Sequence, residues 1–270
     1  MSSAWVDSMP SAYERWLVPA LFQPFAVDLA RRVAALHPRR VLELAAGSGA
    51  LTRELLAALP DGTEVMATDL NDAMVDLGRA QAPGATWRQA DAMALPFDAG
   101  QFDVVACQFG AMFFPDKPAA FAESRRVLDA DGSFVQNVWG PLERHAFEAS
   151  LVRALGAVFP EDPPTFMQTG PHGYADLALV TADLHEGGFD DVVSEALTLE
   201  GHGESAAGLA EGYCLGSPLR FEIERRAALD VTLTRVAEAM TNDLGDGDVA
   251  GSMVAHVLVA RGVRTGDRPS

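Results

Sequence analysis

Positive charge is scarce in this sequence. The chain carries 20 lysine and arginine residues against 38 aspartate and glutamate residues, which gives a formal net charge of −18 over 270 residues. Lys117 is the only lysine. A surface this acidic repels phosphate backbones, so we expect no nucleic-acid partner. Anionic membrane surfaces are disfavoured for the same reason.

Cysteine and long apolar runs are also scarce. Cys107 and Cys214 are the only cysteines and lie far apart, so neither a disulfide framework nor a paired Cys-x-x-Cys zinc site is expected. No uncharged apolar run approaches the ~20 residues of a membrane span. Met1–Pro10 has no basic start and no apolar segment, so no secretory signal is expected. These absences predict a soluble, reduced, cytoplasmic protein without a metal site.

The first half of the chain alternates short apolar runs with amphipathic stretches, which is typical of βαβ units in a parallel sheet. An Asp131-Gly132 turn is expected before the fifth strand. Strands are predicted at residues 40–44, 64–68, 86–89, 102–107 and 133–138, and helices at 51–59, 73–81 and 117–128.

The remaining segments are more helical. Tyr13–Leu36 has the pattern of an amphipathic helix that Pro19 and Pro24 break. Two further strands are predicted at residues 192–199 and 253–260, and residues 264–270 have the composition of a frayed tail. The pattern therefore predicts one sheet-based core with helical additions before, inside and after it.

Polar and small residues follow three of the predicted strands. The first strand runs from Glu43 through two alanines into a Gly-x-Gly segment, which leaves backbone groups accessible to a ligand. Asp69 ends the second strand, where an acid can accept both hydroxyls of a ribose. Asp91 ends the third strand. Ligands of open α/β sheets bind at these carboxyl ends, so the three segments predict a nucleotide or nucleoside site.

Two kinds of cofactor compete for such a site. A dinucleotide fold requires a third glycine for close helix packing, and Thr52 stands at that position. A nucleoside cofactor without a pyrophosphate needs only a backbone loop, an acid for the ribose and an apolar slot for the base. The glycine spacing therefore favours the nucleoside over a nicotinamide cofactor.

These segments resemble a known family in order and spacing. Val41–Gly49 (VLELAAGSG) resembles motif I of class I S-adenosylmethionine-dependent methyltransferases, and Thr68–Met74 (TDLNDAM) resembles the acidic motif that follows it. The match continues through Asp91–Phe97, Phe102–Gly110 and Phe113–Asp116. The spacing is similar to the ubiquinone/menaquinone-biosynthesis-like branch of small-molecule methyltransferases. The resemblance covers about residues 41–139.

The resemblance implies where S-adenosyl-L-methionine binds, beginning with its methionine end. The backbone around Ala45, Gly47 and Gly49 would hold the methionine moiety. Gln108 and Phe109 would face this end and the incoming substrate. The family usually has a glycine where Ala45 stands, and a methyl group there costs little if the backbone dihedrals are ordinary.

For the nucleoside end, the resemblance implies a second set of contacts. Asp69 would bind the ribose, and Leu70 and Met74 would flank the adenine. Asp91 and Ala92 would meet the adenine edge.

Three further residues belong to the predicted cofactor site. Tyr13 and Trp16 on the N-terminal helix would close over the cofactor. Glu43 either contacts the ligand or supports the loop through hydrogen bonds, and the sequence leaves both readings open.

The fold implied by the resemblance is a Rossmann-like class I methyltransferase domain with a mostly parallel seven-stranded sheet. Residues 1–37 are expected to form an N-terminal helical lid and 38–140 the cofactor-binding core. Residues 141–180 and 203–250 would be substrate lid insertions, and 181–202 and 251–263 the rest of the core.

The expected activity is methyl transfer by in-line displacement to oxygen, nitrogen or carbon of a small organic metabolite, with S-adenosyl-L-homocysteine as the product. His145 is the first candidate for a general base and His172 the second. A non-catalytic accessory or sensor protein that binds the cofactor stays open, as does a pericyclase-like enzyme that uses the sulfonium electrostatically. A homodimer also stays open.

Overall fold

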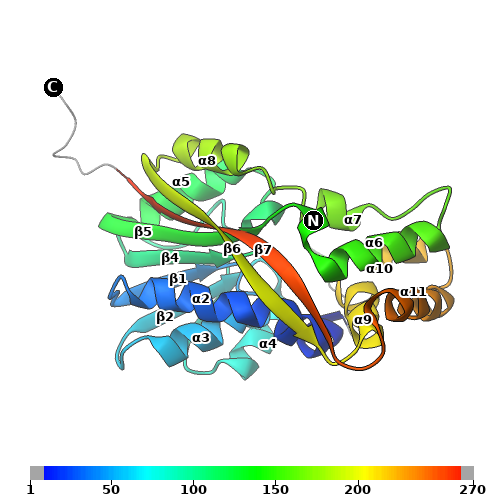
Figure 1. The fold of residues 1–270 in the computed structure, drawn as a ribbon. Coiled ribbons are helices and arrows are strands. Elements are labelled where there is room, and N and C mark those ends of the chain that lie inside the picture. The colour runs from blue at the N-terminus through cyan, green and yellow to red at the C-terminus, as the bar shows by residue number, and fades with distance from the viewer. Residues whose placement is uncertain (1–8, 263–270) are drawn as a thin grey trace. The chain divides into compact units, whose positions relative to one another are not determined.

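The computed structural model describes residues 9–262, in which helices precede and connect the strands of one sheet (Figure 1). The predicted tail at 264–270 and the first eight residues of the predicted lid lie outside this range. The strands are β1 (Arg40–Leu44), β2 (Glu64–Asp69), β3 (Thr86–Gln89), β4 (Phe102–Gln108), β5 (Leu128–Trp139), β6 (Asp191–Gly203) and β7 (Val249–Arg261).

The helices form three groups along the chain. Before β1 lie α1 (Met9–Ala12), the π-helix η1 (Tyr13–Phe22) and α2 (Gln23–Ala34). Between β1 and β5 lie α3 (Ala50–Ala58), α4 (Asp72–Gln81), the short η2 (Ala111–Phe113) and α5 (Lys117–Val127). After β5 come η3 (Leu142–Arg144), α6 (Ala146–Val158), α7 (Phe166–Thr169), α8 (Leu177–Glu186), α9 (Ala206–Gly216), α10 (Leu219–Glu224) and α11 (Leu229–Leu244).

The sheet has seven strands in the order β3-β2-β1-β4-β5-β7-β6. The five strands from β1 to β5 run parallel, and β7 pairs antiparallel with β5. This arrangement confirms the predicted mostly parallel seven-stranded sheet. Because the chain goes outward from β1 to β3 on one side and then returns to β4 on the other, the strand order reverses beside β1. Ligand sites of open α/β sheets lie outside the carboxyl ends of the strands at such a reversal.

The chain divides into two compact units. The first, the sheet unit, contains Ala26–Trp139, Tyr174–Leu197 and the chain from Ala255 onward. The second, the helical unit, contains the chain up to Phe25, Gly140–Gly173 and Thr198–Val254. The division into lids and core made from the sequence stays a prediction.

Helices cover both faces of the sheet in the sheet unit. Side chains of α2 and α3 join one face of the central strands in a buried apolar cluster that includes Leu29, Leu51 and Val135. Phe134, the residue before Val135 in β5, points to the opposite face because side chains alternate along a strand. There its ring lies 5.5 Å from Phe121 of α5 and 5.6 Å from the Phe189 ring. The central strands are therefore buried on both sides, as the strands of parallel sheets are.

Close packing between η1 and α9 characterises the helical unit. The glycines of α9 recur at every fourth position, so they share one face of that helix. Methyl groups at Gly208 and Gly212 would lie 2.5 Å and 2.7 Å from Trp16 and Leu17 of η1. A methyl group at Gly216 would lie 2.5 Å from the Tyr13 nitrogen. Only glycine allows the two helices to approach this closely.

Two local predictions are wrong. Pro19 does not break the N-terminal helix, because it lies within η1, where the backbone N–H of Gln23 bonds to the Val18 carbonyl five residues earlier. The wider π-helical turn relieves the clash between a proline ring and the preceding turn. The predicted Asp131-Gly132 turn lies inside β5, at an irregularity where the pairing with β4 shifts register.

Candidate functional site

The loop after β1 is fastened to the neighbouring strand β2. The backbone N–H of Ala46 donates to the Thr68 carbonyl at 2.9 Å. The backbone N–H of Gly47 donates to Oδ2 of Asp69, also at 2.9 Å. A methyl group at Gly47 would meet no atom within 4 Å, so open space borders the loop. The sequence thus places an accessible backbone segment beside the acid that ends β2.

Backbone strain is concentrated at the ends of β1 and β4. Ala45 has φ of +51° and Phe109 has φ of +50°, and neither residue is glycine. A left-handed conformation costs an L-residue roughly 1–2 kcal/mol, so the condition of ordinary dihedrals at Ala45 is not met. Strained residues of this kind gather at ligand sites in folded proteins. The strain therefore marks the same edge of the sheet that the motifs indicate.

Gly110 makes room for the alanine that replaces the usual glycine. A methyl group at Gly110 would lie 2.5 Å from the Ala45 Cβ and 3.0 Å from the Cys107 sulfur. Because Gly110 itself has ordinary right-handed dihedrals, space rather than conformation requires a glycine there. Ala45 and Gly110 are thus a matched pair.

Glu43 is buried at the end of β1 and supports the loop from below. Its Oε2 accepts a hydrogen bond from the Thr52 hydroxyl at 2.7 Å, and its backbone carbonyl accepts one from the Thr68 hydroxyl at 2.8 Å. Burial is the main cause that raises the pKa of Glu43 to about 8, while the Thr52 bond opposes it. Of the two roles left open by the sequence, loop support is the one with observed contacts.

Asp69 and the residues that follow it form the end of β2. Oδ1 of Asp69 accepts the backbone N–H of Asn71 at 2.9 Å, and burial raises the pKa of the carboxyl although its backbone hydrogen bonds oppose this. Leu70 is 49% exposed, whereas Met74 in α4 is buried. Each carboxylate oxygen can accept a second hydrogen bond, so Asp69 keeps acceptor capacity for ribose hydroxyls.

The ends of β3 and β4 supply the remaining predicted cofactor residues. Asp91 follows β3, is half-buried with Ala92, and accepts the backbone N–H of Met93 at 2.9 Å. Gln108 ends β4, and Phe109 stacks on Trp139 with ring centroids 3.5 Å apart and planes at 9°. An apolar aromatic wall therefore stands at the end of β4.

Most of the predicted cofactor residues thus come from one edge of the sheet unit, the carboxyl ends of β1 to β4. Gly49 differs in that its N–H already donates to the Ala46 carbonyl, and a methyl group on it would lie 3.2 Å from the Trp87 ring. Tyr13 and Trp16 lie on η1 in the helical unit. Their predicted closure over the cofactor stays a prediction.

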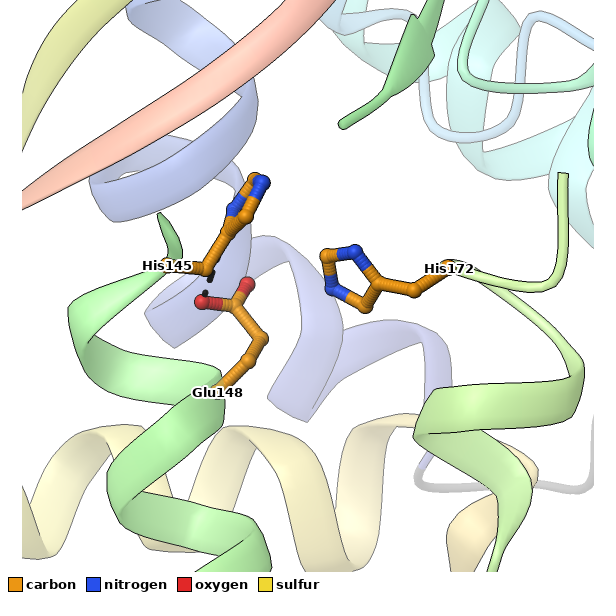
Figure 2. A group of neighbouring side chains, drawn as sticks. All are labelled: His145, Glu148 and His172. Atoms are coloured by element: carbon orange, nitrogen blue, oxygen red, sulfur yellow. Dashed lines mark ion pairs between the residues drawn. The ribbon is translucent and has the colours of Figure 1, made fainter. Parts of the chain in front are cut away.

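The two predicted bases, His145 and His172, are brought together in the helical unit (Figure 2). Their ring centroids are 4.5 Å apart, and both residues are buried. Burial is the largest cause that lowers both pKa values, that of His145 to about 3. The Tyr174 hydroxyl, two residues after His172, donates to Asp183 at 2.5 Å.

Four residues with clear roles at these sites were not predicted from the sequence. Thr52 was noted only because it replaces a glycine, yet its hydroxyl donates a hydrogen bond to Glu43. Gly110 contacts Ala45 and Trp139 stacks on Phe109, and no local sequence pattern predicts these contacts. Glu148 stands beside the two histidines, and its i, i+3 spacing from His145 was the one signal that could have found it.

The sheet order and the flanking helices define a fold, the Rossmann-like class I methyltransferase fold. Two solved structures share the fold. The YcgJ protein of Bacillus subtilis has a TM-score of 0.56 at 16% identity, covering 89% of this chain and 99% of that one. Phosphoethanolamine N-methyltransferase 2 of Haemonchus contortus, solved with phosphomonomethylethanolamine and S-adenosylhomocysteine, has a TM-score of 0.60 at 15% identity, covering 96% and 59%.

Sequence comparison finds a matching domain and several relatives. Residues 41–132 match the family model of a methyltransferase domain. A demethylmenaquinone methyltransferase of Thermus thermophilus is 40% identical over 126 residues, which are 45% of this chain and 56% of that protein. A ubiquinone/menaquinone biosynthesis C-methyltransferase of Shewanella frigidimarina is 36% identical over 110 residues, covering 38% and 44%. The chain spans about half the length of these relatives.

Proposed function

We propose that this chain transfers a methyl group from S-adenosyl-L-methionine to a small organic acceptor. The observation that carries the proposal is the pairing of the open loop at Gly47 with the carboxylate of Asp69 at adjacent strand ends. A backbone loop suits an amino-acid tail, and an acid suits a ribose. The family match and the relatives named as methyltransferases support the same conclusion.

The residues at the strand ends would divide the work of binding. Asp69 would accept the ribose hydroxyls, Leu70 and Met74 would flank the adenine, and Asp91 and Ala92 would meet its edge. When bound, S-adenosyl-L-methionine supplies an electrophilic methyl group, which an acceptor takes by in-line displacement.

The methionine end would be held by a different set of residues. The backbone around Ala45, Gly47 and Gly49 would bind the amino-acid tail. Gln108 and Phe109 would face the acceptor. Alignment of the two reactants is the main contribution that we assign to the protein, because effective molarity alone can lower a barrier by about 7–11 kcal/mol.

The acceptor is proposed to be a small metabolite with a reactive oxygen, nitrogen or carbon. The net charge of −18 disfavours a nucleic acid as substrate. No helix within residues 9–262 is long and apolar enough to cross a membrane. A cytoplasmic location stays a prediction. His145 and His172 stay the predicted bases, although their lowered pKa values make them weak proton acceptors at neutral pH.

Cofactor binding can be tested with a pair of aspartate variants. Asp69→Asn removes one carboxylate oxygen at the proposed ribose site, whereas Asp76→Asn alters an exposed residue of α4 that pairs with Arg79. At 100 times its Kd, S-adenosylmethionine should stabilise the protein by about 2.7 kcal/mol, or roughly 5–10 °C in a melting scan. The Asp76 variant should keep this shift, and the Asp69 variant should lose most of it.

The same scan with S-adenosylhomocysteine and NADH identifies the cofactor class. Stabilisation by NADH alone would refute the proposal and restore the dinucleotide alternative. Turnover is measured as acceptor-dependent formation of S-adenosylhomocysteine, with small phenols, amines and carbon acids as acceptors. Binding without turnover on any of these would favour the non-catalytic or pericyclase-like alternative.

A further inference from the structure

A buried cluster of three side chains in the helical unit lies outside the cofactor motif. His145 lies between η3 and α6, Glu148 stands in the first turn of α6, and His172 follows α7. One potential ligand atom from each residue lies within 4.8 Å of the others. The three residues are 0%, 2% and 8% exposed. Figure 2 shows the three side chains directed toward a common space.

His145 lies next to both other members of the cluster. Nδ1 of His145 and Oε2 of Glu148 are 3.9 Å apart, which is too long for a hydrogen bond. The two imidazole rings meet edge to face at 69°. Two imidazoles and a carboxyl buried at such distances have the composition and the spacing of a ligand set.

The backbone around the cluster fixes how the imidazoles point. Nδ1 of His172 lies 2.9 Å from the Gly140 carbonyl, so the proton sits on Nδ1 and the lone pair of Nε2 faces away from the backbone. Gly140 in turn donates its N–H to the Val254 carbonyl at 2.8 Å. A second nitrogen bonded to a backbone carbonyl is the usual support of a metal-bound histidine.

His145 contacts the same backbone pair. The Val254 N–H donates to Nε2 of His145 at 3.4 Å, the outer limit of a hydrogen bond. This bond places the proton of the neutral ring on Nδ1, the nitrogen that lies nearer Glu148. Metal binding through Nδ1 therefore requires His145 to release that proton and to give up this weak hydrogen bond.

The chemical composition of the cluster suits a cation. Neutral imidazoles and an ionised carboxylate are the forms that bind metals. Glu148 stands in the first turn of α6, where the helix dipole stabilises a carboxylate.

We propose that His145, Glu148 and His172 bind a divalent first-row transition-metal ion, with Zn²⁺ as the first choice. Two imidazoles and one carboxylate suit Zn²⁺ or Fe²⁺, whereas Mg²⁺ and Ca²⁺ require oxygen ligands. Bonds of about 2.0–2.1 Å place tetrahedral ligand atoms about 3.3 Å apart, so the ligand atoms must approach one another by up to about 1.5 Å. Three protein ligands leave a coordination position open. A nitrogen bound to a metal cannot accept a proton, so this proposal replaces the base role predicted for His145 and His172. It does not depend on the proposed methyl transfer.

The test uses the full-length protein after treatment with a chelator. Co²⁺ is titrated in, and the visible d–d absorption is recorded, because its intensity reports a four- or five-coordinate protein site. We expect saturation at one equivalent per chain, displacement of the signal by Zn²⁺, and a rise in melting temperature. Parallel titrations with Fe²⁺ and Mn²⁺ identify the preferred ion. Absence of stoichiometric binding to the unaltered protein would overturn the proposal without any variant.

Variants assign the ligands. His172→Ala and Glu148→Gln should each weaken Co²⁺ binding by more than the about 10–100-fold that loss of an outer-shell partner costs. His202→Ala is the control, because His202 is an exposed histidine of the same unit with Glu200 at 3.2 Å. Equal weakening by the control would assign the metal to the surface and refute the buried site. Circular dichroism of each variant shows whether the fold is retained.

Discussion

The contact between Ala45 and Gly110 predicts a strong energetic coupling between two substitutions. Gly110→Ala places a new methyl group 2.5 Å from the Ala45 Cβ, whereas carbon atoms in contact normally stay about 3.5–4.0 Å apart. Relief of this overlap must move the strained loop after β1. Overpacking of this kind costs about 1–3 kcal/mol, so Gly110→Ala alone should destabilise the protein by that amount.

Removing the Ala45 methyl group first should remove most of that cost. Ala45→Gly relieves a left-handed alanine, worth roughly 1–2 kcal/mol, and loses about 0.5–1 kcal/mol to the greater freedom of glycine in the unfolded chain. The single variant should therefore stabilise the protein by between about 0 and 1.5 kcal/mol. In its presence, Gly110→Ala meets only the Cys107 sulfur at 3.0 Å.

The assay is a double-mutant cycle by urea unfolding, with the four proteins compared at equal concentration. Midpoints are converted to free energies only if the denaturant dependence is unchanged. We expect a coupling of at least about 1 kcal/mol between the two sites. Combining Ala45→Gly with Gly156→Ala in α6 is the control and should be additive, because Gly156 has no neighbour within 4 Å of a new methyl group. Additivity of the Ala45 and Gly110 substitutions within about 0.5 kcal/mol would refute the packing argument.

Two further predictions concern a buried acid and a pair of helical glycines. The pKa of Glu43 is raised from 4.5 to about 8, so the folded protein binds more protons than the unfolded chain between pH 4.5 and about pH 8. The free energy of unfolding should therefore fall as the pH rises through this range, by up to about 1.4 kcal/mol per pH unit. Glu43→Gln should flatten this slope in urea titrations at several pH values, and an unchanged slope would contradict the assignment. Gly78→Ala should destabilise the protein by about 1–3 kcal/mol because its methyl group would lie 2.2 Å from the Trp87 ring. Gly156→Ala should stabilise it by about 0.5–1 kcal/mol, because a new methyl group there meets no atom within 4 Å. If the two substitutions shifted the melting temperature in the same direction, this explanation would be wrong.

Local patterns predict the strands and the cofactor edge of the sheet because both depend on neighbours in sequence. Apolar runs bounded by glycine and aspartate specify β1, β2 and β4, and parallel pairing then brings their ends together. The acids and glycines that end these strands are therefore visible in the sequence. The motif resemblance extends this reading because its residues occupy the same strand ends.

Features that depend on distant contacts were not predictable in the same way. The left-handed conformation of Ala45 places its Cβ where a side chain at Gly110 would stand. Gly110 lies 65 residues later in the sequence. Pro19 normally signals a break, and packing of η1 on α9 overrides that preference. Glu148 lies close to His172 only in the folded structure, so its place in the cluster could not be predicted from the sequence. No metal site was predicted because the sequence lacks a paired Cys-x-x-Cys motif, and the separation of 27 positions from His145 to His172 gives no local ligand spacing.

The contact of η1 with α9 has a consequence for synthesis of the protein. Tyr13–Phe22 is translated before any strand of the sheet, but the glycines that receive it are translated only after β6. Until then, the buried residue Leu17 has no cover from α9. A nascent or truncated chain that ends before Ala206 would contain β1 to β5 yet expose this apolar surface. Such a chain is expected to depend on chaperones, and removal of the C-terminal segment should promote aggregation.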